Sequence, residues 1–202
     1  MKKILVATSL ALACSTAGAQ QLFFDDFNDE RPGLNRTPTG WTVSGGTVDI
    51  IGSGPNGTLF DGRPGNGYYI DLDGSTNNAG LLSTGLSFAA GTIYELSFDL
   101  SGSGDINTMN YGINFDSALA VDILVPVTLP PGPNFIRFSL LFSTPVATTG
   151  RVVFDHLGGD NLGMLLDDVR VAVAIPEPGT WGLLLAGLGL LGFAARRERK
   201  QA

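Results

Sequence analysis

The feature that most limits how this chain can fold is a two-residue alternation of apolar and polar side chains within short segments that end in turn residues. From residue 94 to residue 100 every even position is Tyr, Leu or Phe and every odd position is polar. Residues 136–142 again carry Ile, Phe or Leu at every even position. Successive side chains of a β-strand point to opposite faces, so this period of two predicts strands with one buried face.

Turn signals separate further short runs of β-branched and aromatic residues, and together these runs predict about ten strands. The turn signals include Gly45-Gly46, Pro55-Asn56-Gly57, Asp73-Gly74 and Gly158-Gly159. The predicted strands cover residues 22–27, 47–51, 67–72, 79–84, 93–100, 109–115, 121–127, 136–142, 151–155 and 164–173. Many short strands joined by short turns predict an all-β fold, a two-sheet jelly-roll-like sandwich over residues 20–174. A domain of this size buries enough surface to fold without disulfides.

Residues 1–19 have the three parts of an export signal: a basic start, an apolar run and a small-residue end. The small residues are Ala17-Gly18-Ala19, which predicts an N-terminal signal helix that is cleaved before Gln20. Lipidation at Cys14 is an alternative, but the position three residues before that cysteine is not the leucine that a lipobox prefers. We therefore expect the mature protein to begin at Gln20.

Residues 175–202 place a proline-flanked acid, an apolar segment and a basic cluster in that order. The apolar segment, residues 181–195, would span roughly 22 Å as a helix, somewhat less than a hydrocarbon core of about 30 Å. The positive-inside rule keeps the basic cluster in the cytoplasm and the chain before residue 181 outside it. The cluster consists of Arg196, Arg197, Arg199 and Lys200.

This order of parts, with Pro176-Glu177-Pro178 at its start, resembles the PEP-CTERM anchor of Gram-negative bacteria. The resemblance implies that an exosortase-type membrane protease recognises Pro176, Glu177 and Pro178 while a hydrophobic sorting helix holds the precursor in the inner membrane. It also implies that the mature protein reaches the cell surface or extracellular matrix. Two prolines favour the extended backbone that a protease cleft binds. An ordinary single-pass anchor is the alternative.

The segment between the two ends is acidic. Residues 20–175 contain six arginines and no lysine against 17 Asp and Glu, a net charge of −11. Such a segment is repelled by nucleic acid and by anionic lipid, which excludes nucleic-acid binding. Neutral ligands and cations are the partners that this charge favours.

Several stretches of this segment resemble the galactose-binding-like jelly rolls, which include many carbohydrate-binding modules. They are residues 24–28, 40–41, 48–50, 67–74, 90–99 and 163–169. The resemblance implies a β-sandwich that binds extracellular polysaccharide. Members of this fold often hold a structural Ca²⁺ ion between the first strand and the last.

The first and last predicted strands carry oxygen donors of the kind that Ca²⁺ prefers. The resemblance therefore predicts a calcium site at Asp25, Asp26, Asn28, Asp167 and Asp168. Asp167 has the same strand parity as Val169, which predicts that its carboxylate faces the core and needs a partner. Backbone N–H groups at a bulge are the alternative partner.

Aromatic residues next to glycine suggest a platform on which a sugar ring would stack. Tyr68 and Tyr69 are favoured, because one of two adjacent strand residues must face outward. Trp41 and Tyr111 are further aromatic candidates, and core packing is the alternative for all four.

No catalytic residue is predicted. His156 is the one histidine, and it is expected in solvent at a strand end, with no nucleophile elbow to serve it. We therefore expect a non-catalytic, exported β-sandwich that binds polysaccharide. A glycan-active hydrolase that uses paired carboxylates and a structural protein without a ligand are the alternatives.

Overall fold

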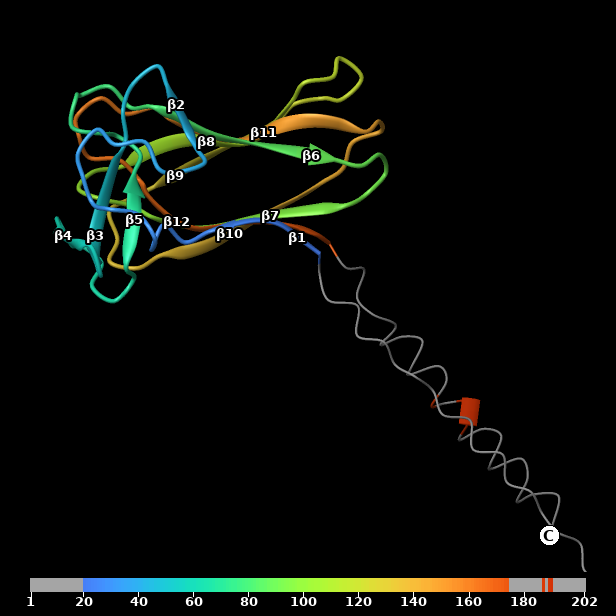
Figure 1. Ribbon diagram of the computed structural model, residues 1–202, viewed down its shortest axis with the longest axis horizontal. Coiled ribbons are helices and arrows are strands. Elements are labelled where there is room, and N and C mark those ends of the chain that lie inside the picture. Colours follow the sequence, from blue (N-terminus) through green and yellow to red (C-terminus); the bar gives the residue numbers. More distant parts are fainter. Residues whose placement is uncertain (1–19, 175–186, 188, 191–202) are drawn as a thin grey trace, which may run out of the picture. The chain divides into compact units, whose positions relative to one another are not determined.

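The computed structural model describes residues 20–174 together with residues 187, 189 and 190 (Figure 1). The predicted signal helix lies outside the described residues, and so does the predicted sorting helix apart from residues 187, 189 and 190. Every described strand belongs to Gln20–Ala174, which forms one compact unit. The strands are β1 (Gln21–Asp25), β2 (Thr42–Ser44), β3 (Asp49–Gly54), β4 (Gly57–Leu59), β5 (Tyr68–Asp71), β6 (Leu81–Phe88), β7 (Tyr94–Ser101), β8 (Asn107–Phe115), β9 (Ile123–Leu129), β10 (Ile136–Phe142), β11 (Thr148–His156) and β12 (Leu165–Val173).

The strands form two antiparallel sheets that pack face to face (Figure 1). One sheet has the order β10-β7-β12-β5-β3-β4, and β1 also pairs with β12. The other has the order β2-β6-β11-β8-β9. The predicted all-β, two-sheet sandwich is confirmed. Each predicted strand overlaps an observed one, whereas β2 and β4, with three residues each, were not predicted.

The core lies between the two sheets and follows the alternation of the sequence. In β7, Leu96, Phe98 and Leu100 are fully buried, and the side chains between them face outward. The Phe98 ring lies 5.0 Å from the Phe154 ring of the opposite sheet, in an edge-to-face contact. Such contacts add stability beyond the area that the rings bury. Both hydrophobic clusters of the described residues lie within Gln20–Ala174, so this unit contains a complete core of its own.

Strand β12 changes partner along its length. One of its sides pairs with β7, while the other pairs first with β5 at Leu165 and Leu166 and then with β1. A β-bulge interrupts the register between Asp167 and Arg170, and Asp168 has the positive φ of 50°. A bulge adds one residue to a strand, so the residues on its two sides follow opposite parities.

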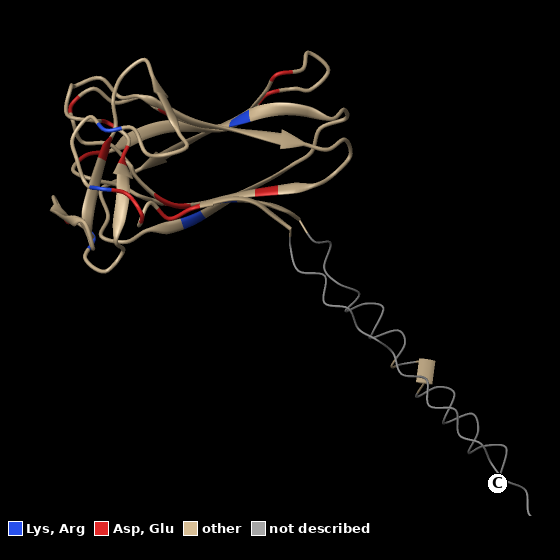
Figure 2. Ribbon diagram, in the orientation of Figure 1, with Lys and Arg blue, Asp and Glu red and all other residues tan. Residues whose placement is uncertain are grey.

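Acidic residues occupy both strands and loops of this unit, and several lie around β3 and β5 (Figure 2). Asp49 begins β3 and Asp71 ends β5. Among the described residues, no helix is long and apolar enough to span a membrane.

Candidate functional site

A cavity of about 330 Å³ opens on the outer face of the seven-stranded sheet, over β3, β5 and the start of β12. Its size is at the lower end of the range for small-ligand pockets. Apolar, acidic and hydroxyl side chains line it together. They are Asp49, Ile51, Phe60, Gly62, Arg63, Tyr69, Asp71, Ser75, Ser103, Asn161, Leu162 and Leu165.

Strand alternation explains which side chains reach this face. Ile50, Ile70 and Leu166 point into the main core, so their neighbours along each strand point outward. Ile51, Tyr69 and Leu165 form a second, smaller apolar cluster on the outer side. Asp49 pairs with Asp71 in the register of β3 and β5, so the two carboxylates extend from one face of neighbouring strands.

Both oxygens of the Asp49 carboxylate accept hydrogen bonds from the protein. Its Oδ1 accepts from the backbone N–H groups of Asn35 at 2.6 Å and Ser75 at 3.2 Å. Its Oδ2 accepts from the Ser75 hydroxyl at 2.6 Å. These three donors hold the Asp49 carboxylate in a fixed position.

Asp71 has a different environment. Its Oδ1 accepts hydrogen bonds from the backbone N–H groups of Asp73 at 3.0 Å and Gly163 at 2.9 Å. Burial raises the pKa of Asp71 to about 7, and the charges of Asp49 and Asp73 act in the same direction. The two carboxyl groups of the cavity therefore differ: Asp49 accepts hydrogen bonds on both oxygens, while Asp71 gains or loses its proton near neutral pH.

Arg63 shapes the rim of the cavity. Its Nε donates to the Ser101 hydroxyl at 2.8 Å, and its Nη2 donates to the carbonyls of Gly102 and Gly132. Its Nη1 donates to the carbonyl of Gly62. The guanidinium thus ties the loop between β4 and β5 to two other loops.

Two large apolar side chains at the cavity are open to solvent. Phe60 is 69% exposed and Leu162 is 43% exposed. Phe60 has a φ of 46°, which is unusual for a bulky residue and is often found at functional sites. The sequence prediction missed Phe60. The available signal was a single aromatic residue inside a stretch rich in Gly, Pro and Asp, residues 60–67.

The prediction that Tyr68 or Tyr69 exposes a ring for sugar stacking is wrong. The two rings do lie on opposite faces of the sheet, yet both are 0% exposed. Tyr68 lies in the main core. Tyr69 is covered because Phe135 packs against its ring at 5.6 Å and the N–H groups of Gly62 and Arg63 bond its hydroxyl.

Trp41 and Tyr111 are also buried, at 7% and 6% exposure. The Trp41 ring packs against Phe154, and its Nε1 donates to Asp25 Oδ2 at 2.7 Å. Core packing therefore accounts for both residues.

The prediction that Asp167 faces the core is also wrong. Val169 and Leu166 both point inward, and the bulge between them leaves Asp167 on the outer side, paired in register with Asp99. The side chain is nevertheless only 6% exposed. Burial raises the pKa of Asp167 to about 8, and neighbouring carboxylates of Asp168, Asp99 and Asp26 add to the effect.

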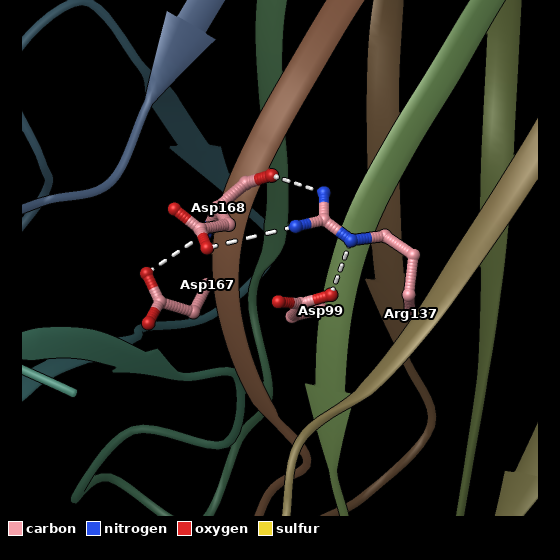
Figure 3. A network of polar contacts seen from close by, with 4 residues as sticks. All are labelled: Asp99, Arg137, Asp167 and Asp168. Carbon is pink, nitrogen blue, oxygen red and sulfur yellow. Dashed lines mark hydrogen bonds and ion pairs between the residues drawn. The ribbon is translucent and has the colours of Figure 1, made fainter.

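Asp167 belongs to a polar network on the outer face (Figure 3). Its Oδ1 accepts a hydrogen bond from the N–H of Asp168 at 2.8 Å, which is the backbone partner that a bulge offers. Arg137 of β10 lies 2.7 Å from Asp99 Oδ1 and 3.6 Å from Asp168 Oδ2. The positive charge of Arg137 thus offsets the negative charges of Asp99 and Asp168.

The structure assigns protein hydrogen bonds to most of the predicted calcium ligands. Asp25 accepts from Trp41 and from the N–H of Phe27, and Asp26 accepts from the N–H of Asn28. The Asn28 amide oxygen accepts from the N–H of Tyr68 at 3.0 Å. Within residues 20–174 and the three further described positions, no three acidic, histidine or cysteine side chains converge as metal ligands. The calcium ion stays a prediction.

His156 ends β11, as predicted, but its side chain is buried at 3% exposure rather than open to solvent. The backbone nitrogens of Gly158 and Met164 lie 3.0 and 3.2 Å from its two ring nitrogens. Burial lowers the pKa of His156, while the charge of Asp73 opposes that shift. The ring therefore supports the loop that carries Leu162 to the cavity.

The predicted sorting residues lie outside the described residues, and a comparison with protein families tests them. Residues 174–200 match the PEP-CTERM protein-sorting motif. This motif implies processing by an exosortase and sorting to the cell surface. No curated protein sequence matches this chain.

The sandwich is similar to several solved structures. The CBM22-1 xylan-binding domain of Paenibacillus barcinonensis Xyn10C has 13% identity and a TM-score of 0.53, over 79% of this chain and 97% of that one. The K3 cleaved adhesin domain of Lys-gingipain from Porphyromonas gingivalis has 16% identity and a TM-score of 0.52, over 78% and 100%.

A third structure contains the CBM22-1 and GH10 modules of Clostridium thermocellum endo-1,4-β-D-xylanase 10B, complexed with xylohexaose. It has 15% identity and a TM-score of 0.51, and the match covers 78% of this chain but only 29% of the xylanase chain. At these identities the similarity shows the fold. The chain therefore combines a C-terminal PEP-CTERM sorting motif with a two-sheet β-sandwich similar to carbohydrate-binding modules.

Proposed function

We propose that this chain is an exported, non-catalytic protein of the cell surface or extracellular matrix, and that its β-sandwich binds polysaccharide. The sorting motif at residues 174–200 supports the destination. The similarity of the sandwich to a xylan-binding domain supports the class of ligand.

The observation that carries the proposal is the exposed Phe60 ring at the edge of a cavity lined by carboxyl and hydroxyl groups. A sugar ring has an apolar C–H face and a rim of hydroxyl groups, so it needs both kinds of surface. Phe60 and Leu162 offer the apolar contact. Asp71 offers an acceptor for a sugar hydroxyl.

The alternative of a glycan-active hydrolase has one observation in its favour. Asp49 and Asp71 are paired across two strands, and burial raises the pKa of Asp71 to about 7, as in the general acid of a glycosidase. Both oxygens of Asp49 already accept hydrogen bonds from Asn35 and Ser75. Asp49 is also only 5% exposed, so a substrate has little access to it, and this geometry favours binding over hydrolysis.

Affinity electrophoresis of the full chain in gels that contain soluble polysaccharides tests the proposal. We expect retardation by at least one neutral polysaccharide, and Phe60→Ala should weaken it about tenfold, because an aromatic contact is worth roughly 1.4 kcal/mol. Leu124→Ala is the matched control, since Leu124 is 52% exposed on the other sheet. Equal retardation of the wild type and Phe60→Ala would refute this site. If the wild type releases reducing ends from a polysaccharide and Asp71→Asn does not, the protein is a hydrolase instead.

A further inference from the structure

The charges around the cavity narrow the class of polysaccharide. On the basis of the proposed glycan-binding function, we infer that the cavity recognises a protonated amino sugar, with the ammonium group at Asp71 and the sugar ring on Phe60. The ligand would then be a cationic, non-acetylated polysaccharide. Neutral and acidic polysaccharides would bind more weakly.

Two acidic residues face each other at the cavity. Asp49 and Asp71 are direct partners in the antiparallel register of β3 and β5. Carboxylates directly opposite each other on one face destabilise a sheet. A cation bound beside them would relieve this repulsion, whereas a neutral sugar would not.

Among the described residues that line the cavity, no cation is available to Asp71. Arg63 is the one basic residue among the side chains that line it. Its hydrogen bonds go to Ser101 and to the carbonyls of Gly62, Gly102 and Gly132. The guanidinium therefore stabilises loops and does not neutralise Asp71.

The geometry of the Asp71 carboxyl group also favours a cationic ligand. Both hydrogen bonds that it accepts from described residues end on Oδ1, which leaves Oδ2 for a ligand. An ammonium group has three donors and a positive charge, and a charge-assisted bond is about twice as strong as a neutral one. Burial raises the pKa of Asp71 to about 7, and the negative charges of Asp49 and Asp73 add to this shift.

The apolar rim and the charge of the whole domain support the same ligand class. Phe60 provides a face for the sugar ring, which a simple inorganic cation would not require. The net charge of −11 over residues 20–175 repels acidic polysaccharides and attracts cationic ones.

Isothermal titration of the full chain in a mild detergent tests the inference near neutral pH. The probes are glucosamine, N-acetylglucosamine and glucose oligosaccharides of equal length. We expect the glucosamine oligosaccharide to bind at least about tenfold more tightly than the other two. Asp71→Asn should remove this preference, and Phe60→Ala should weaken binding of all three probes. Asp122→Asn, which removes an exposed charge from the loop before β9 of the other sheet, should change nothing.

A second measurement does not depend on the folding of a variant. Added salt should weaken the binding of glucosamine oligosaccharides by the wild type, while the binding of acetylated oligosaccharides stays the same. Equal affinity for the three probes, with sensitivity to Phe60→Ala, would overturn the inference and leave the proposed function standing. If a lysine-rich peptide binds through Asp71 and no oligosaccharide does, the inference that the ligand is a sugar would be wrong. Absence of binding to every oligosaccharide would overturn the inference together with the proposed site.

Discussion

Replacement of Asp167 by asparagine should stabilise the sandwich at mildly alkaline pH. The Asp167 side chain is 6% exposed, and its neighbours Asp168, Asp99 and Asp26 are also acidic. Asparagine has nearly the same shape and retains an oxygen that can accept the N–H of Asp168. It removes only the cost of a buried negative charge.

The magnitude follows from the pKa of this group in the two states. The pKa is about 8 in the folded protein, compared with an ordinary value of 3.8 in the unfolded chain. Between these values the folded state binds more protons than the unfolded state, so the free energy of unfolding falls as the pH rises from about 4 to about 8. Four pKa units set an upper limit of about 6 kcal/mol. Relaxation of the bulge and entry of water reduce the cost of the buried charge. We therefore expect Asp167→Asn to raise the free energy of unfolding by about 2–3 kcal/mol.

Thermal unfolding of Gln20–Ala174 in the presence of a chelator measures the effect. Because about 1 kcal/mol shifts the Tm of a domain of this size by roughly 2–4 °C, Asp167→Asn should raise the Tm by about 5–10 °C at pH 8. At pH 4 most of the effect should be lost, because the folded state is then protonated and the unfolded state, with a pKa of 3.8, is about half protonated. Asp122→Asn is the control, since Asp122 is exposed. Equal Tm values of the wild type and Asp167→Asn at pH 8 would show that the burial argument is wrong.

Four further predictions concern the metal, the two ends of the chain and the cavity. If calcium binds only the folded form, chelation should lower the Tm of the wild type by several degrees, since a hundredfold excess of ion over Kd stabilises the fold by about 2.7 kcal/mol. The Tm of Asp167→Ala should not respond to the chelator. Identical calorimetric traces of the wild type with and without EDTA would rule the ion out. Replacement of Glu177 and its two flanking prolines should leave the precursor unprocessed in the inner membrane, and immunoblots that show normal processing would contradict the sorting interpretation. Mass spectrometry should find Gln20 at the mature N-terminus, and a lipid-modified Cys14 there would show that the cleavage prediction is wrong. Gly163→Ala should destabilise the protein by about 1–3 kcal/mol, because a Cβ atom there would overlap Asp71 Oδ1 and the Asp73 nitrogen. Denaturant titration measures this change, and an unchanged unfolding midpoint would argue against this packing of the cavity.

The strands and the sorting signal could be predicted from the sequence because both depend on local patterns. Alternation along β7 and β10 identifies each strand and its buried face without knowledge of its partners. The same rule placed Tyr68 and Tyr69 on opposite faces of the sheet, as the structure shows. The tail is recognisable for a similar reason, since its proline, apolar and basic parts are contiguous in the chain.

Only the tertiary structure decided what covers each outward face. Tyr69 points outward as alternation requires, but Phe135, distant in sequence, covers its ring. Asp167 changes face because β12 bulges where its partner changes from β5 to β1, and a single inserted residue reverses the parity. Parity rules carry no information about such an insertion.

The cavity likewise depends on contacts between segments far apart in sequence. It unites Asp49 of β3, Asp71 of β5 and Leu162 of the loop before β12, while Arg63 holds the loop that carries Phe60. Local sequence therefore determined the strands, the acidic character and the sorting motif of this protein. The pairing order of the strands and the packing of loops over the outer face decided which carboxylate is buried and which aromatic ring meets solvent, because both depend on long-range contacts that no local pattern specifies.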